Sequence, residues 1–349
     1  MILPQTYAAT MFLLLLSMLC MGVWVSTLKL AGKWRFELFY MDFAFGVLIA
    51  ALIYAFTVGN LGFDGFTLID DLQHAGKHQW LYCLLSGMIF NLGNLLLVAA
   101  VSVAGMVLAF PAAMAIALVL STVLGFAATK PGTGLILLLG CGFLLTSVVL
   151  DAMGYRLLSM QHHEMLARAG KAKSTRRPAA LKGIVLSVAG GLLLGSFTPL
   201  LDKARQGEQG LGPYAAGALF AIGMFCSTFV FTIFFINLPV EGEPAEISSY
   251  FTERLRQHVW GFIGGLVWCT ASIAGLVAAA APDNAQVDLS LRAAIIQAAP
   301  LLTALIGIVI WKELRYSDVR VKSLTVLMAV LYACGVVMVS AGPFLAGKP

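Results

Sequence analysis

Residues 156–182 read RLLSMQHHEMLARAGKAKSTRRPAALK, and the chain on either side of them is almost entirely apolar. The stretch holds seven Lys or Arg and a single acid, Glu164. A basic loop between apolar segments is typical of the cytoplasmic side of a membrane. We therefore expect a polytopic membrane protein with a first half at 1–152, a basic cytoplasmic linker at 153–181 and a second half at 182–349.

The composition excludes an ordinary soluble domain. Of the 349 residues, 60% are hydrophobic and 11% are charged, whereas soluble domains have about 25% charged residues. The net charge of +5 is no signal for nucleic-acid binding, because the basic residues sit in short loops. The sequence has no GxxxxGK[ST] motif for ATP and no nucleophile–base set. We expect neither an enzyme nor an ATP-driven pump.

The apolar segments predict an all-α integral membrane fold. A bilayer core of about 30 Å needs about 20 apolar residues in each helix. By this criterion ten transmembrane helices are expected, at residues 7–28, 37–58, 81–103, 105–128, 132–152, 182–203, 212–238, 259–281, 290–311 and 321–343.

The distribution of Lys and Arg predicts the orientation of these helices. Sixteen of the 22 Lys and Arg lie in the loops after the first, fifth, seventh and ninth spans or within the first two residues of the span that follows. Basic loops stay on the cytoplasmic side. Both termini are therefore expected outside and the central loop in the cytoplasm.

The two halves contain matching segments. GMIFNLGN at 87–94 corresponds to GLVWCTAS at 265–272, at an offset of 178 residues. The spans that follow each contain one proline, and the first and sixth spans share a glycine two residues before an aromatic side chain, in GVWVST from Gly22 and GSFTPL from Gly195. Because each half has five spans, the second half must be inverted. Inverted repeats are typical of alternating-access carriers with a site near the bilayer midplane.

Polar residues within spans are candidates for solute contact, because they are costly in lipid. Asn91 and Asn94 lie three residues apart on one helix, and hydrogen bonding between helices is the alternative role. On the matching helix, Trp268 offers a stacking surface and Ser272 a hydroxyl. Gln297, three residues before the proline of the ninth span, is a further candidate.

Two acidic residues open the second span. Asp42 follows Glu37 by five residues, which places it about 7.5 Å deeper along a helix. Asp42 is the candidate proton carrier, and a salt bridge to Lys29 or Arg35 is an equally good alternative. Glu37 is the second candidate, although we expect it at the membrane interface.

The remaining candidates concern walls, hinges and metals. Trp24 and Phe197 are candidate cavity walls, with core packing as the alternative, and Pro111 and Pro300 are candidate gate hinges because proline kinks a helix. Asp151 is expected at the interface. The neighbouring side chains His162, His163 and Glu164 lack a second cluster, so neither a metal nor a cofactor is expected.

Five segments together resemble the drug/metabolite transporter superfamily, and within it the ureide permeases. They are GVWVSTLKL (22–30), ELFYMDFAFG (37–46), LGNLLLVAAVSVAGM (92–106), LLDKAR (200–205) and QAAPLLTALIGIVIWKEL (297–314). Bacterial glucose and rhamnose uptake carriers are more distantly similar. The small multidrug branch relies on a Glu in its first helix, and none is present here.

The resemblance implies a secondary active transporter that imports a ureide or a nucleobase-like solute, with protons as coupling ion, in a bacterial inner (plasma) membrane. A sugar uptake carrier is the nearest alternative. A passive channel, a metabolite exporter, a membrane scaffold and a membrane enzyme are the other readings. The expected partners are a small solute, the bilayer and protons, and no nucleic acid.

Overall fold

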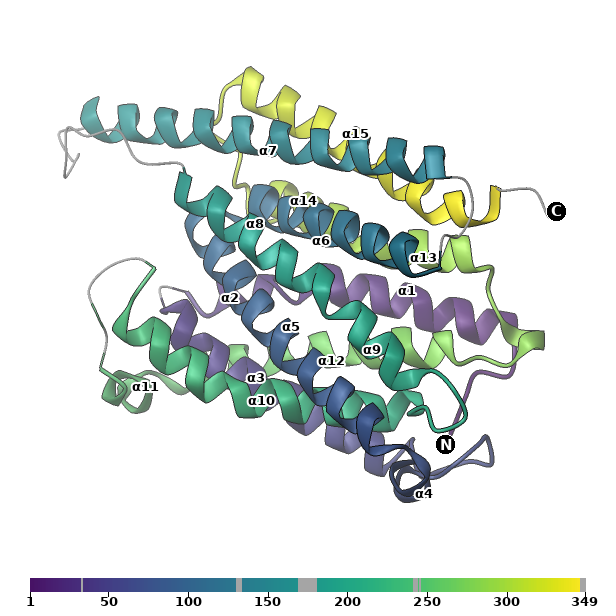
Figure 1. Ribbon diagram of the computed structural model, residues 1–349. Helices are drawn as coiled ribbons and strands as arrows, with labels where there is room; N and C mark the ends of the chain where they lie inside the picture. Colours follow the sequence, from purple (N-terminus) through teal and green to yellow (C-terminus); the bar gives the residue numbers. More distant parts are fainter. Residues whose placement is uncertain (33, 130–133, 169–180, 241–243, 245, 346–349) are drawn as a thin grey trace. The chain divides into compact units, whose positions relative to one another are not determined.

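The computed structural model describes residues 1–349 except 33, 130–133, 169–180, 241–243, 245 and 346–349. The described residues form helices and contain no β-strand (Figure 1), which confirms the all-α fold. The elements are α1 (Tyr7–Val23), α2 (Ser26–Leu30), α3 (Phe36–Phe56), α4 (Leu68–His74), α5 (Lys77–Ala104), α6 (Met106–Thr129), α7 (Gly134–Arg168), α8 (Leu181–Ser196), α9 (Thr198–Arg205), α10 (Pro213–Asn237), α11 (Ser248–Thr252), α12 (Leu255–Ala279), the 3-10 helix η1 (Asp283–Ala285), α13 (Leu289–Gln297), α14 (Ala299–Val309) and α15 (Val319–Leu345).

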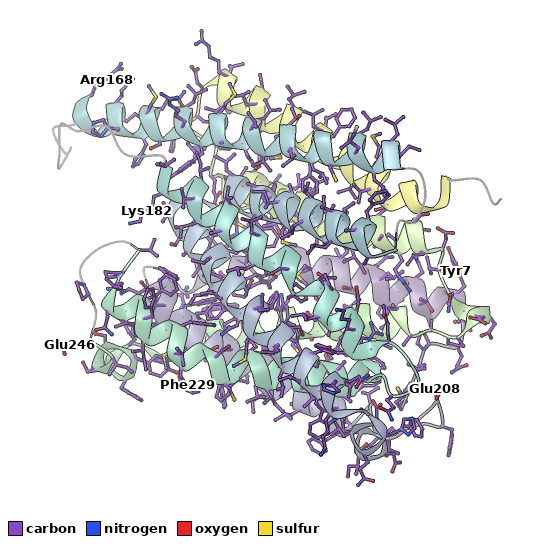
Figure 2. The ribbon with its side chains drawn as sticks, in the orientation of Figure 1. Tyr7, Arg168, Lys182, Glu208, Phe229 and Glu246 are labelled. Carbon is purple, nitrogen blue, oxygen red and sulfur yellow. The ribbon has the colours of Figure 1, made fainter. Side chains whose placement is uncertain are left out.

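Ten segments of the described chain are long and apolar enough to cross a bilayer, and they match the ten predicted spans. The one large difference is the fifth helix, which continues beyond residue 152 to Arg168. Residues 153–168 are rich in Leu, Met and Arg, which have high helix propensity in water. Figure 2 labels Arg168 at the end of α7 and Lys182 in the first turn of α8. Most of the basic residues of the linker lie between them, outside the described residues.

Three of the spans are interrupted helices. The first breaks into α1 and α2 around Trp24, the sixth into α8 and α9 at Phe197, and the ninth into α13 and α14 at Ala298. Pro199 and Pro300 lie directly after the second and third breaks, where the missing proline N–H and the ring disfavour a continuous helix. At the first break, the hydroxyl of Thr27 donates to the carbonyl of Trp24 at 2.7 Å.

The chain packs into two compact units, each built from both halves of the sequence. Unit 1 contains Met1–Leu95 and Ser196–Ala299, and unit 2 contains Leu96–Gly195 and Pro300–Pro349. The division into repeats at 1–152 and 182–349, with a linker at 153–181, concerns the sequence rather than packing. It stays a prediction.

In unit 1, glycines allow helix backbones to approach closely. A Cβ on Gly265 of α12 would lie 2.0 Å from the carbonyl oxygen of Phe43, and one on Gly46 of α3 would lie 2.2 Å from that of Phe262. Small residues commonly allow such contacts between membrane helices. As a result α3 and α12 pack closely against each other in unit 1.

In unit 2, α7 lies along α15 and also packs against α6 (Figure 1). The turn before α6 contains Gly105 with φ +83°, a conformation that glycine adopts without steric cost. The carboxylate of Glu313 then accepts hydrogen bonds from the backbone N–H groups of Met106 and Val107, at 3.2 and 3.0 Å. A carboxylate at a helix N-terminus is favourable, so Glu313 caps α6.

Candidate functional site

Unit 1 gathers aromatic rings from several helices and from two of the helix breaks. Trp268 of α12 lies 4.7 Å from Phe90 of α5, centroid to centroid. Phe90 lies 5.2 Å from Phe197, at the break between α8 and α9, and Phe220 of α10 lies 5.8 Å from Phe197. Trp268 and Phe197, two of the candidates from the sequence, therefore belong to one aromatic cluster. Such tilted and edge-to-face pairs are the preferred aromatic geometries.

The cluster continues toward the break in the first span. Phe43 of α3 lies 6.2 Å from Trp268 and 4.9 Å from Trp24. Trp24 is 1% exposed and Trp268 is 5% exposed, whereas Phe197 is half-buried. Among the predicted aromatic walls, Phe197 is the more exposed one.

The two asparagines of α5 lie beside this cluster and are hydrogen-bonded within unit 1. The amide nitrogen of Asn91 donates to Ser227 at 2.8 Å, and its amide oxygen accepts from Thr228 at 3.3 Å. The amide nitrogen of Asn94 donates to the hydroxyl of Tyr40 at 3.2 Å. Both asparagines are buried. These bonds join helices, the alternative role considered above, and contact of either amide with solute stays a prediction.

The partners of these asparagines were not identified from the sequence. Tyr40 is fully buried and also donates to the backbone carbonyl of Asn91 at 3.2 Å. Ser227 and Thr228 are the adjacent hydroxyl residues in the apolar α10. The sequence shows that these hydroxyl residues lie within an apolar span, but it does not show that they contact α5.

The other two polar candidates are half-buried. Ser272 donates to the carbonyl of Trp268 in its own helix at 3.1 Å, a common arrangement for a helical serine. Gln297 is the last residue of α13, directly before the break in the ninth span. Both side chains retain some exposure.

Asp42 forms part of a separate polar cluster near the start of α3. Its carboxylate accepts a hydrogen bond from the hydroxyl of Tyr250 at 2.5 Å, and its other oxygen lies 2.9 Å from Nδ1 of His258. Trp34 covers this group, with its ring 4.8 Å from that of His258. Burial raises the pKa of Tyr250 above its ordinary value, and the hydrogen bond to Asp42 raises it further.

The contacts described for the Asp42 carboxylate are those with Tyr250 and His258. Arg35 pairs with Glu37 at 3.0 Å, and Glu37 is 1% exposed. His258 was missed because it lies 216 residues from Asp42. The 2.9 Å contact between Asp42 and His258 joins α3 to the first turn of α12.

The two candidate hinges differ in their surroundings. Pro300 follows the break between α13 and α14 and is the residue at which the chain enters unit 2. Pro111 lies inside the continuous helix α6. Within the described part of the chain, no group of three His, Cys, Asp or Glu side chains has an arrangement that could hold a metal ion.

The sequence is similar to plant ureide permeases over nearly its full length. It is 24% identical to "Ureide permease 4" of Arabidopsis thaliana, covering 97% of this chain and 98% of the relative. It is 22% identical to "Ureide permease 1" and 23% identical to "Ureide permease 2" of the same plant, covering 94% of this chain and 96% of each relative. No family model matches the sequence.

These relatives are named as permeases and not as enzymes, in agreement with the expectation that the chain is no enzyme. Ten apolar helices and near-full-length similarity to permeases together support a multi-pass membrane transporter with a ureide permease-like sequence.

Proposed function

We propose that the chain is a secondary active transporter that imports a small polar solute of the ureide or nucleobase type by alternating access, coupled to protons. The observation that carries this proposal is the aromatic cluster of unit 1, whose two sides correspond under the sequence repeat. The proposed setting is a bacterial inner membrane, with both termini outside and the basic loop in the cytoplasm.

The close helix contacts of unit 1 support an inverted repeat. Gly46 and Gly223 are 177 residues apart, and Gly87 and Gly265 are 178 apart. Gly265 and Gly46 bring α12 against α3 near Phe43 and Phe262, whereas Gly87 and Gly223 bring α5 against α10 near Phe220 and Leu84. Adding the same offsets converts one set of contacts into the other.

The aromatic contacts also correspond, with offsets of 177 for Phe43 and Phe220, 178 for Phe90 and Trp268, and 173 for Trp24 and Phe197. On one side, Trp24 contacts Phe43 and Phe43 contacts Trp268. On the other side, Phe197 contacts Phe220 and Phe220 contacts Phe90, at 5.8 and 5.3 Å. The Phe90–Trp268 pair joins the two sides. Broken helices and a repeat-related centre are the arrangement in which carriers bind their solutes.

The aromatic centre suits a flat, polar solute. Ring faces favour stacking against a planar heterocycle. Ser272, which lies one turn from Trp268, and Gln297 at the end of α13 are the candidate hydroxyl and amide groups. The names of the relatives point to ureides as the solute class. In this proposal the amides of Asn91 and Asn94 hold α5 against α10 and α3 beside the aromatic rings. In a second conformation of the carrier an amide contacts the solute directly.

Proton coupling is assigned to Asp42 with His258 as its partner. The 2.9 Å contact allows a proton to be shared between carboxylate and imidazole, and Tyr250 supplies a second hydrogen bond. Replacing Asp42 by Asn should abolish net uptake driven by a pH gradient and leave solute counterflow measurable. Equal loss of both activities would assign Asp42 to folding or solute binding instead.

The solute class is tested by thermal unfolding of the purified protein with ureides, nucleobases and sugars, in the wild type and in Phe197→Leu. A ligand present at 100 times its Kd stabilises a folded protein by about 2.7 kcal/mol. We expect a ureide or nucleobase to raise the unfolding midpoint and the effect to shrink in Phe197→Leu. The matched control is Phe56→Leu, which changes an aromatic ring of α3 that is 59% exposed.

A midpoint shift with sugars alone would replace the solute class by the sugar alternative. A ureide shift that survives Phe197→Leu unchanged would remove the aromatic cluster from the site. Flux without counterflow in vesicles would indicate a channel and overturn the carrier mechanism.

A further inference from the structure

Asp151 is a buried acid that the proposed site does not use. It lies midway along α7 and is 3% exposed. Neither oxygen of its carboxyl group has a hydrogen-bond partner among the residues that the structure describes. The sequence predicted an interfacial position, because the apolar run ends near residue 152. The helix continues to Arg168, so Asp151 lies far from either end of α7.

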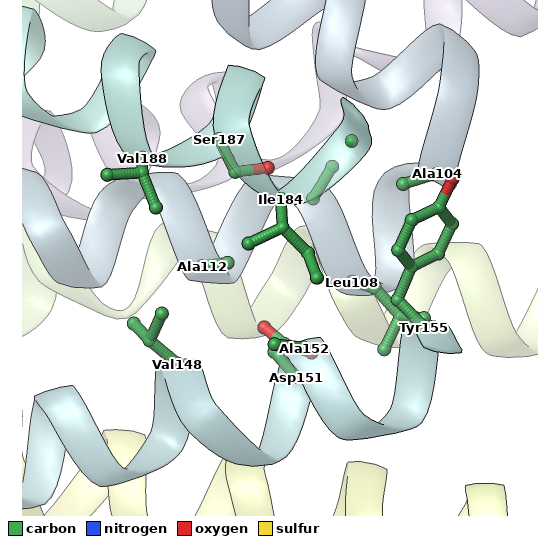
Figure 3. Close-up of a pocket in the computed structure, with 12 residues that line it drawn as sticks. Ala104, Leu108, Ala112, Val148, Asp151, Ala152, Tyr155, Ile184, Ser187 and Val188 are labelled. Atoms are coloured by element: carbon green, nitrogen blue, oxygen red, sulfur yellow. The ribbon is translucent and has the colours of Figure 1, made fainter. Parts of the chain in front are cut away.

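The carboxyl group lines a small cavity inside unit 2. Its volume is about 20 Å³, which is enough for one water molecule. Figure 3 shows the carboxyl of Asp151 directed from α7 toward α6 and α8, with Ala112, Ile184 and Ser187 around the space. Apart from Asp151, Ser187 and Tyr155 are the residues with polar side chains among those that line this cavity.

No described charge compensates an ionised carboxylate at this position. The helix α6 has no titratable side chain between Met106 and Thr129, and Lys182 of α8 is exposed. On α15, which packs along α7, the buried titratable group is Tyr332, whereas Arg320 and Lys322 are exposed. Because an unpaired buried charge is strongly disfavoured, the carboxyl is expected to hold a proton.

The surroundings also favour a proton over a metal cation. The cavity side chains supply one carboxyl and two hydroxyl groups, whereas hard cations such as Ca²⁺ take six to eight oxygen ligands. A neutral carboxylic acid needs no further ligand.

Small residues occupy one face of α8. Gly183, Ser187, Gly191 and Gly195 recur every four residues along it, and Gly183 and Ser187 line the cavity together with Ile184 and Val188. A Cβ on Gly191 would lie 2.5 Å from the carbonyl oxygen of Ala113 in α6. Small residues of this kind let helix backbones approach closely, so α8 packs tightly on α6 beside the carboxyl group.

We propose that Asp151 is a proton-binding site of unit 2, protonated in this conformation and able to release its proton when the cavity is hydrated. In the release step the O–H bond of the acid breaks, the proton passes to the entering water, and a carboxylate remains. Rebinding is the reverse. The use of this site in coupling rests on the proposed function, whereas proton binding itself does not.

The first test needs no transported solute. Infrared spectra of the full chain in lipid are compared between wild type, Asp151→Asn and the exposed control Asp283→Asn. At neutral pH we expect a carboxylic-acid C=O band that is present in the wild type and the control, absent in Asp151→Asn, and lost as the pH rises. Wild-type and Asp151→Asn spectra without this difference would show an ionised Asp151 and overturn the proposal.

The wild type provides a second measurement in case Asp151→Asn fails to fold. A hydrophobic carbodiimide reacts with buried protonated carboxyl groups, and mass spectrometry locates the product. We expect modification of Asp151 at neutral pH that declines at higher pH. Absence of labelling in protein that is labelled elsewhere within its spans would contradict the proposal.

The coupling role is read from transport. If solute and proton binding are linked, Asp151→Asn should reduce pH-driven net uptake by about 5- to 150-fold, the usual range of such couplings, with counterflow retained. Unchanged net uptake would limit Asp151 to proton binding and overturn its role in coupling. Absence of transport in the wild type would refute the proposed function, and the spectra would still decide the state of Asp151.

Discussion

At the scale of single residues, Asn91 is held at both ends of its amide. It donates to Ser227 and accepts from Thr228, and so joins α5 to α10 beside the aromatic cluster. Each hydroxyl also donates to the carbonyl of Met224 in its own helix, at 3.0 and 2.9 Å. A polar side chain with this many partners acts first as a positioning group for the rings beside it.

Replacing Asn91 by Ala should lower the free energy of unfolding by about 1–3 kcal/mol, because the buried partners lose their hydrogen bonds and a cavity opens. Thermal or denaturant unfolding in detergent measures this loss. Ser272→Ala is the matched control, since Ser272 bonds only the carbonyl of its own helix in the contacts described. Equal stability of Asn91→Ala and wild type would mean that this amide does not lock α5 to α10.

Asp71 predicts a pH dependence of stability outside the spans. Its carboxylate accepts two hydrogen bonds from the N–H of Gly212, at 3.2 and 2.9 Å, directly before α10. Burial raises the pKa of Asp71 above its usual value, and the Gly212 bond and the charge of His74 offset this only in part. The folded state therefore binds this proton more tightly than the unfolded state, whose pKa is about 3.9.

As the pH rises through the interval between these two pKa values, Asp71 should lower stability, because the folded protein then binds more protons than the unfolded protein. Asp71→Asn should remove this part of the slope while its amide oxygen still accepts from Gly212. Unfolding midpoints measured across acidic pH provide the test, with the exposed neighbour Asp70→Asn as control for loss of charge. Identical slopes in wild type and Asp71→Asn would contradict the assignment.

At the scale of elements, hydropathy was sufficient to predict the ten spans, because lipid requires about 20 apolar residues whatever the packing. The break at Phe197 could be anticipated from Pro199, and the aromatics Trp24 and Phe197 from their matching glycines. The extension of α7 beyond residue 152 could not be anticipated, because a hydropathy criterion detects only the apolar part of a helix. Pairings such as Asp42 with His258 join residues far apart in sequence and depend on which helix faces pack together.

The repeat-related helix crossings make a paired prediction. Ala at Gly265 would place its Cβ 2.0 Å from the Phe43 carbonyl oxygen, and Ala at Gly87 would place it 2.2 Å from that of Phe220. Each substitution should destabilise unit 1 by about 1–3 kcal/mol through overpacking. In the control Gly142→Ala, the Cβ meets no atom within 4 Å, and the higher helix propensity of Ala should leave stability unchanged or raised by up to about 1 kcal/mol.

These three variants are compared by thermal unfolding in the same detergent. A loss in Gly265→Ala without one in Gly87→Ala would show that the two crossings are not equivalent. That result would remove the structural support for the inverted repeat, although the sequence match would remain.

At the scale of the whole molecule, the proposed repeat relates helix crossings and aromatic contacts of the two halves, but it does not relate Asp42 or Asp151 to another acid. Adding the offset of 177 to Asp42 leads to Leu219, and adding it to Asp151 leads to Met328, so neither acid has an acidic counterpart. The glycine crossings and aromatic contacts of unit 1 do have counterparts at these offsets. In the proposed mechanism, the two acids without counterparts would give proton movement its direction.

The direction of proton movement depends on which side of the membrane each loop occupies, and the distribution of Lys and Arg predicts that side. Alkaline phosphatase is active only where its disulfides form, outside the cytoplasm, whereas green fluorescent protein serves as the cytoplasmic reporter. Fusions after Pro349 and after the exposed Phe63, between α3 and α4, should show phosphatase activity. A fusion after Arg168, at the end of α7, should fluoresce. The reverse pattern at all three positions would invert the topology, and agreement between Arg168 and Phe63 would contradict the predicted number of spans between them.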